Sequence, residues 1–423
     1  MQKININNFE EKLYYEKLPN GLEVFLVPML QKQNYFCMFG TKYGGRNLKF
    51  KIDNKEVEVP SGIAHFLEHK LFEREDINPF EFYGKSGTDV NASTTSECTN
   101  YYFFGNNQFL DNLKYLLNWI TKLEINDEKV KKEQGIILEE ASMYKDRPDR
   151  ILYERILNNV YQEDTRRKKV IGTDEDIIKI TKEDLDICYK SFYRPDNMYI
   201  IAAGNINPTD TIKVIKEELK DFKNPKEKIE LIEANEPDEV FKDYEEINID
   251  VETPKLGISY KINKNVFKNL KIDKYNLDYY LQMLITLGFG SSSDFKEELL
   301  NKGLFTTFNH QITDTNTHYL IDFYASSFEA NKLIKEIDNY VNQIKIKEED
   351  FHRLKKTWIA SEIRMIDSIN ATVYNILDDI LDYNEFKGNK INDIKNLEFS
   401  KLKEVQKKLD LKNKAIVLIT KNN

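Results

Sequence analysis

The order of strand-like and helical segments in the first half of the chain recurs in the second half. Each half begins with apolar runs typical of β-strands, continues with helical periodicity, and closes on a short apolar strand, at residues 197–204 and 415–420. A charged segment with two prolines separates the halves at residues 223–245. This order predicts an α+β fold of two homologous domains, each a mostly antiparallel sheet covered by helices.

The charged segment sets the expected domain boundaries. We expect an N-terminal domain over residues 1–222, a linker over 223–245 and a structurally similar C-terminal domain over 246–423. The alternative for residues 223–245 is a long solvated loop within one domain.

Composition limits which classes of partner and which cellular compartment are expected. The net charge of -9 argues against nucleic acid or anionic membrane as the main partner. No apolar run approaches the roughly 18 residues of a membrane span, and the N-terminal segment has no apolar core of signal-peptide length. The three cysteines are far apart in the sequence and indicate a reducing compartment. We therefore expect a cytoplasmic protein.

A histidine pair with an enclosed glutamate carries the clearest chemical signal. On a helix His65, Glu68 and His69 share one face, so two imidazoles can reach a single ion. Zinc accepts imidazole nitrogens and keeps a water molecule in catalytic sites. Glu68 can take the proton of that water and pass it to a leaving amine. The alternative is a helix whose histidines are ordinary core or surface residues. The N-terminal domain is thus the expected catalytic, zinc-binding domain, and the C-terminal domain has no metal motif.

Two further carboxylates are candidates for completing the metal site. Helical spacing over residues 127–149 places Glu133 and Glu140 on the apolar stripe, whereas Glu139 projects the other way. Seven residues separate the pair by about 10.5 Å along the axis, so one is expected to bind the metal and the other to orient a ligand or the water. Spacing alone leaves open which does which. The alternative is a salt bridge to a buried lysine or arginine.

HFLEH, followed some seventy residues later by EQGIILEE, resembles the inverzincin peptidases of the insulinase, pitrilysin and mitochondrial processing peptidase family. The likeness extends through SGIAHFLEHKLF, DVNASTTSECTNYYF and FYRPDNMYIIAAGNI; it covers most of the first half and is weak in the second. The resemblance implies one Zn2+ per chain held by His65, His69 and Glu140, with Glu133 beside the ligands and Glu68 as catalytic base. The length is similar to that of short bacterial members with two domains per chain.

The resemblance implies a zinc-dependent endopeptidase that cleaves peptides or unfolded segments within an enclosed chamber. In this family substrate adds as a strand to a sheet edge, and the matching residues here are Asn91, Ala92, Ser93 and Thr94. Taken alone, this stretch is equally consistent with an ordinary half-buried strand. The alternative functions are a non-catalytic peptide-binding or assembly subunit of a processing-peptidase-like complex, and a zinc hydrolase of a non-peptide substrate.

One departure from the family pattern points to a partner chain. Complete sites in the family also use an arginine and a tyrosine, seven residues apart, to hold substrate and its developing oxyanion. The corresponding positions here are Leu299 and Thr306. We therefore expect a heterodimer with a paralogue that supplies this Arg/Tyr pair, with a homodimer as the alternative.

Overall fold

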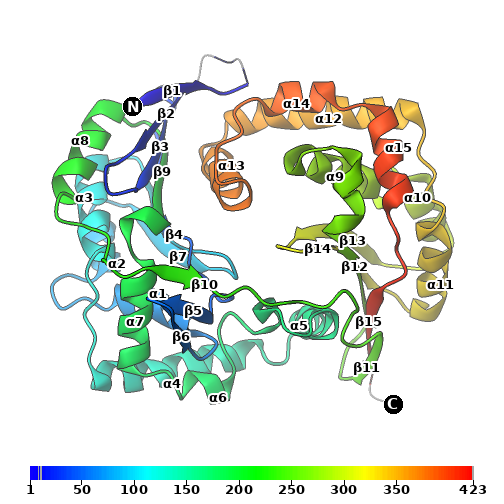
Figure 1. Ribbon diagram of the computed structural model, residues 1–423, viewed down its shortest axis with the longest axis horizontal. Helices are drawn as coiled ribbons and strands as arrows, with labels where there is room; N and C mark the ends of the chain where they lie inside the picture. Colours follow the sequence, from blue (N-terminus) through cyan, green and yellow to red (C-terminus); the bar gives the residue numbers. More distant parts are fainter. Residues whose placement is uncertain (8, 10–11, 422–423) are drawn as a thin grey trace. The chain divides into compact units, whose positions relative to one another are not determined.

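The computed structural model describes residues 1–7, 9 and 12–421, which form two compact units (Figure 1). The first unit contains residues 1–142, 168–233 and 362–390, and the second contains the described residues of 143–167, 234–361 and 391–421. Helices and mostly antiparallel sheets in both units confirm the predicted α+β class. Within the described part of the chain, no helix is both long and apolar enough to cross a bilayer.

A seven-stranded sheet organises the first unit. Its strand order is β1 (Gln2–Asn5), β2 (Lys12–Lys17), β3 (Glu23–Pro28), β9 (Met198–Gly204), β4 (Tyr35–Thr41), β8 (Thr99–Gly105) and β7 (Asp89–Thr94). All neighbours are antiparallel except β3 and β9. A small second sheet has the order β10 (Ile229–Leu231), β5 (Lys49–Ile52) and β6 (Lys55–Glu58). The fold thus leaves β7 at one edge of the large sheet.

The central strands of this sheet are apolar on both faces because helices cover both faces. Val24 and Leu26 of β3 pack into the larger core with the helices of the N-terminal part, whereas Phe25 between them packs on the opposite face. The helices of the N-terminal part that contribute to this larger core are α1 (Ile63–Phe72), α2 (Pro79–Gly84), α3 (Phe109–Ile120), α4 (Asp127–Tyr144), α6 (Asp174–Ile177), α7 (Lys182–Phe192) and α8 (Pro208–Glu218).

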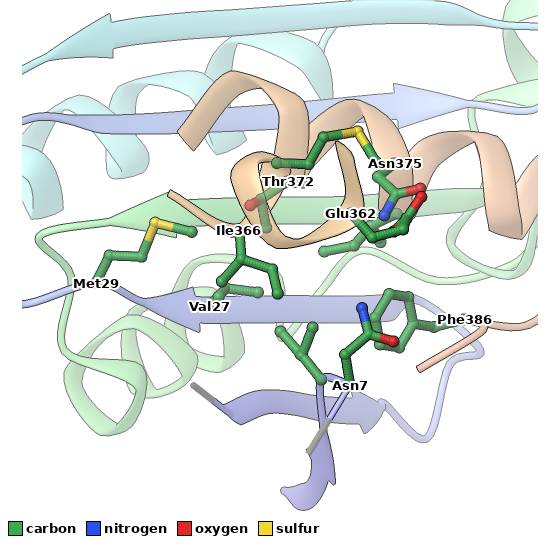
Figure 2. Close-up of a pocket in the computed structure, with 11 residues that line it drawn as sticks. Asn7, Val27, Met29, Glu362, Ile366, Thr372, Asn375 and Phe386 are labelled. Atoms are coloured by element: carbon green, nitrogen blue, oxygen red, sulfur yellow. The ribbon is translucent and has the colours of Figure 1, made fainter. Parts of the chain in front are cut away.

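The opposite face is covered by α13 (Ile369–Asp382), a helix from the C-terminal part of the sequence. Its Val373, Ile376, Leu377 and Ile380 are buried in one cluster with apolar side chains of β3, β4 and β9. Figure 2 shows the small cavity that remains beneath α13, lined by side chains that include Val27, Met29, Ile366, Thr372 and Asn375. At about 20 Å³ it has room for little more than one water molecule, so the helix packs closely on the sheet.

The second unit repeats this plan around a five-stranded sheet. The strand order is β11 (Tyr244–Asn248), β15 (Lys414–Thr420), β12 (Lys255–Asn263), β14 (His318–Ser326) and β13 (Thr307–Asp314), with only β11 and β15 parallel. Its helices include α9 (Lys274–Phe289), α10 (Asp294–Asn301), α11 (Ala330–Val341), α12 (Glu348–Ile366) up to residue 361, α14 (Lys390–Asn396) from residue 391, and α15 (Phe399–Lys408). 3-10 helices occur at Thr165–Arg167 and Lys264–Leu270 in this unit, and at Pro195–Asn197 in the first unit.

A helix from the N-terminal part of the sequence, α5 (Pro148–Val160), packs on one face of the second sheet. Gly257 of β12 provides the space for it, since a Cβ there would lie 2.8 Å from Cγ1 of the fully buried Ile156. Each unit is therefore completed by a helix from the other half of the sequence. The chain passes from residue 233 in the first unit to residue 234 in the second, within the range expected to be a linker.

Candidate metal centre

Helix α1 presents its three chemically active side chains on its only accessible face. His65, Glu68 and His69 are partly exposed, whereas the apolar residues around the rest of the helix are buried. The helix starts after Gly62, whose backbone has φ 93°, a conformation that favours glycine. A Cβ at Gly62 would also lie 2.6 Å from the carbonyl oxygen of Ile171. The glycine therefore allows α1 to begin at this position, close to the backbone of Ile171.

Helix α4 supplies the acidic residues, in agreement with the predicted stripe. Glu133 is buried and Glu140 is partly buried, whereas Glu139 is exposed. Ile137, one turn from each of the two inward glutamates, is fully buried and packs into the core of the first unit. Core packing by this helix therefore directs Glu133 and Glu140 toward α1.

The side chains of His65, His69 and Glu140 converge on one point. One ligand atom from each of the three lies within 4.8 Å of the other two, and no other such group of three histidine, cysteine or acidic side chains occurs within residues 1–7, 9 and 12–421. Oε2 of Glu140 lies 3.8 Å from Nε2 of His65 and 3.4 Å from Nε2 of His69. Tetrahedral zinc with bonds of about 2.0–2.1 Å requires ligand atoms roughly 3.4 Å apart. The three side chains fit a zinc ion on this criterion.

Glu133 holds the ring of His69 from the side away from this point. Its Oε1 lies 2.9 Å from Nδ1 of His69, and because an ionised carboxylate only accepts, Nδ1 carries the proton and Nε2 is left to bind a metal. Burial alone lowers the pKa of His69, but the hydrogen bond and charge of Glu133, with the charges of Glu140 and Glu68, outweigh it and raise that pKa. The same contact helps to orient the imidazole.

The partner that sequence reasoning missed is Lys70. Its fully buried ammonium group donates to Oε2 of Glu133 at 3.4 Å, to the carbonyl of Lys129 at 3.3 Å and to the carboxylate of Glu73. Burial tends to raise the pKa of Glu133, yet the hydrogen bond to His69 and the charges of Lys70 and His69 lower it overall. Glu133 therefore has both roles that the sequence analysis gave as alternatives. It orients the proposed ligand His69, and it forms a buried ion pair with Lys70. The position of Lys70 among the apolar residues of α1 was the sequence signal that could have indicated a buried ion pair.

Glu68 points to the edge strand of the sheet. Its Oε2 accepts a hydrogen bond of 2.5 Å from the hydroxyl of Thr94, the last residue of β7. Burial raises the pKa of Glu68, as does the charge of Glu140, while the hydrogen bond from Thr94 and the charge of His69 oppose that rise. A carboxylate with a raised pKa beside a candidate metal site suits proton transfer.

The predicted peptide-binding residues lie on the outermost strand of the first sheet. Asn91, Ala92, Ser93 and Thr94 belong to β7, which pairs with β8 on one side. Among the described residues no strand pairs with its other side. This side of β7 is open to an additional strand, although the backbone N–H of Ala92 already donates to Oδ1 of Asn91 at 2.8 Å.

Neither residue at the positions of the family's arginine and tyrosine offers a group to substrate. Leu299 is fully buried in the core of the second unit. The hydroxyl of Thr306 donates to the carbonyl of Ser326 at 3.2 Å. The second unit supplies no arginine or tyrosine at these two positions.

The remaining histidines take no part in the metal centre. His318 is buried, and its Nε2 lies 3.0 Å from Oδ1 of Asp238. His310 is partly buried on β13, and His352 is exposed on α12. These three belong to the second unit, and among the described residues none of them is in a group of three candidate metal ligands.

Two family models match the chain in succession. Residues 54–174, which include α1, β7 and α4, match "Insulinase (Peptidase family M16)", and residues 179–357 match "Peptidase M16 inactive domain". The chain belongs to the insulinase family, peptidase family M16, which confirms the predicted resemblance. The match to an inactive domain begins after the metal motif, at residue 179, and extends into the second half.

Named relatives agree with this family. The chain is 36% identical over 308 residues to "Uncharacterized zinc protease YmfH" of Bacillus subtilis, covering 72% of this chain and 71% of the relative. It is 28% identical over 203 residues to "Probable mitochondrial-processing peptidase subunit beta" of Schizosaccharomyces pombe, covering 47% and 42%. The crystal structure of an M16-like protein from Alicyclobacillus acidocaldarius is 28% identical with a TM-score of 0.90, covering 98% of this chain and 99% of that one.

Proposed function

We propose that this chain is a zinc-dependent endopeptidase whose metal is held by His65, His69 and Glu140. The observation that carries the proposal is the convergence of these three side chains on one point in the first unit, with Glu68 on the same face of α1. Glu133 acts beside the ligands by accepting a hydrogen bond from the Nδ1–H group of His69. Membership of a zinc protease family supports the choice of zinc and of a peptide bond as the target.

The chemistry divides between the metal and Glu68. Zinc, when bound, supplies a Lewis acid that polarises a carbonyl and lowers the pKa of a water molecule. Glu68 accepts the proton of the attacking water and later passes it to the leaving amine. Its partly buried position, with Thr94 as a hydrogen-bond donor, keeps the carboxylate at a defined place for both transfers.

Substrate binding is assigned to the backbone of β7. An extended peptide would pair with Asn91, Ala92, Ser93 and Thr94 as an added strand, which brings its backbone toward the end of β7 where Glu68 is bonded. Such pairing reads backbone groups, so selection would depend mostly on length and on extended or unfolded conformation. Cleavage within an enclosed chamber, as in the family, is part of this proposal.

A partner chain is expected to complete the site. Leu299 is a core residue and Thr306 bonds to Ser326, so another chain must supply groups that hold substrate and its developing oxyanion. The proposal is a heterodimer with a paralogue that carries the arginine and tyrosine, and a homodimer is its alternative. The purified chain should cleave weakly alone and gain strongly on mixing with that paralogue. Full activity in a strictly monomeric preparation would refute the partner.

The second candidate is a non-catalytic subunit that binds peptides or serves assembly, and the match to an inactive-domain model is the observation in its favour. Glu68→Gln separates the two. The variant should keep one zinc per chain by elemental analysis and lose cleavage of an unfolded protein by roughly 10²–10⁴-fold. Glu139→Gln, which changes an exposed carboxylate on α4, is the matched control. If the wild-type preparation cleaves no faster than Glu68→Gln, with or without the paralogue, the endopeptidase proposal fails.

A further inference from the structure

We infer that Thr94 is a positioning residue for Glu68, and that it links the carboxylate to the strand on which peptide would pair. The inference rests on the proposed function, and it adds a side-chain role to a residue expected only to offer its backbone. Its starting point is the 2.5 Å hydrogen bond from Oγ1 of Thr94 to Oε2 of Glu68. Within the described residues, this is the only hydrogen bond to the Glu68 side chain.

The hydroxyl proton of Thr94 is committed to Glu68. A threonine hydroxyl has one proton to donate, and the other nearby acceptor, Oγ1 of Thr99, lies at 3.5 Å. Thr99 uses its own proton in a 2.9 Å bond to the carbonyl of Tyr43. The shorter and charge-assisted bond to the carboxylate is the stronger of the two contacts open to Thr94.

The donor itself is held from several directions. Thr94 pairs with Thr99 across the β7–β8 hairpin, and its β-branched side chain has few rotamers. The hairpin turn that follows is bonded to the segment after β4, through Gly45 N to the carbonyl of Thr95 at 2.9 Å and Arg46 N to the carbonyl of Ser96 at 3.1 Å. Thr94 is therefore a fixed point against which a flexible glutamate side chain can be oriented.

The position of Thr94 on β7 gives this bond a second consequence. A peptide that pairs with the outer edge of β7 would lie against the strand that carries the donor. Because strand and carboxylate share one hydrogen bond, the paired peptide would meet a Glu68 that is already oriented. Holding a reacting group in place without changing substrate affinity is expected to act on kcat rather than on KM.

The test compares Thr94→Val, which removes the hydroxyl but keeps the shape, with Thr94→Ser, which keeps the hydroxyl. The assay uses the zinc-loaded full chain, with the paralogue if required, and a quenched fluorogenic unfolded peptide as substrate. In this assay Thr94→Val should lower kcat roughly 10- to 100-fold with little change in KM. Thr94→Ser should stay within about 3-fold of wild type. Thr307→Val, at a threonine of the edge strand β13 in the second unit, is the matched control and should behave as wild type.

Two further readouts keep the positioning role separate from the proposed function. All variants should retain one zinc with unchanged affinity for Zn2+, and crystal structures of the zinc-loaded proteins should show one Glu68 rotamer in wild type and Thr94→Ser but several in Thr94→Val. Loss of wild-type cleavage would sink the peptidase proposal, whereas the rotamer comparison tests Thr94 without any turnover. A single unchanged Glu68 rotamer in Thr94→Val, equal losses in the Val and Ser variants, or an effect confined to KM would overturn the positioning role.

Discussion

Glu133 and Lys70 form a buried ion pair directly behind His69: the ammonium group lies 3.4 Å from one carboxylate oxygen, while the other oxygen lies 2.9 Å from the imidazole. A charged lysine is rarely fully buried without such partners, because desolvation of an unpaired charge is costly. The pair therefore connects a buried cation in α1 to a ligand of the proposed zinc site.

Removing either member of the pair should weaken zinc binding without removing a ligand. Lys70→Met keeps the length of the side chain but leaves Glu133 without its cation, and Glu133→Gln removes the charge that orients His69. Each should lower the affinity for zinc about 10- to 100-fold, as for other residues that orient metal ligands. Competition with a chromogenic chelator measures the change. Lys129→Met, at an ion pair with the exposed Glu75, is the control and should bind zinc as wild type does.

The proposed ligands should differ from their neighbours in metal stoichiometry. His65→Ala, His69→Ala and Glu140→Ala each remove one of the three converging atoms, so the zinc content after dialysis should fall well below one per chain. Elemental analysis together with circular dichroism separates loss of metal from loss of fold. Glu139→Ala should retain full occupancy, and equal zinc content in all four variants would contradict the ligand assignment.

Stability below neutral pH should depend on Glu236 in the second unit. Burial alone raises the pKa of Glu236, but its bond to Lys261 and three backbone N–H donors, of Gln162, Glu163 and Asp164, outweigh it and lower the pKa. A carboxylate whose pKa is lowered by folding stabilises the fold above its unfolded pKa. That contribution is lost as the pH falls through the folded value.

Glu236→Gln should therefore cost about 3–5 kcal/mol of unfolding free energy near neutral pH, since it leaves the buried Lys261 unpaired. The difference from wild type should shrink as the pH falls below the ordinary value of 4.5. Urea unfolding at a series of pH values measures both effects. Glu230→Gln, at an exposed pair with Lys228, is the control, and a pH-independent difference for Glu236→Gln would rule out this origin.

The packing of α5 on the second sheet should depend on the absence of a side chain at Gly257. Gly257→Ala places a Cβ 2.8 Å from Cγ1 of Ile156 and should cost about 1–3 kcal/mol of unfolding free energy. Ile156→Ala removes that atom and should by itself cost about 2–5 kcal/mol through the cavity it leaves. The double variant should be more stable than the sum of the two changes implies. Strict additivity in thermal or urea unfolding would show that the two sites do not share this contact.

The sequence was sufficient for features that depend on local periodicity. The spacing of His65, Glu68 and His69 predicted one helix face, and the stripe that holds Val130, Glu133 and Ile137 predicted the inward side of α4. The long buried strands were likewise recognisable from apolar and β-branched runs. These elements are determined mostly by which of their own residues are buried.

Features that depend on distant contacts were not predictable in this way. The short strands β1, β5 and β6 are mostly polar and partly exposed, and no apolar run marks them. Lys70 is marked by its place among the apolar residues of α1, but its partner Glu133 is identified only once α4 is placed beside it. The exchange of α5 and α13 between the two units leaves no local pattern, because an amphipathic helix reveals that it has a partner but not which sheet that partner is.

The helix that covers the second face of the first sheet spans Ile369–Asp382, so that face stays uncovered until synthesis has passed this helix. From the completion of β9 at Gly204 until then, the nascent chain exposes the apolar side of β3, β4 and β9. The nascent protein therefore exposes an aggregation-prone apolar surface until α13, or a chaperone in its place, covers it.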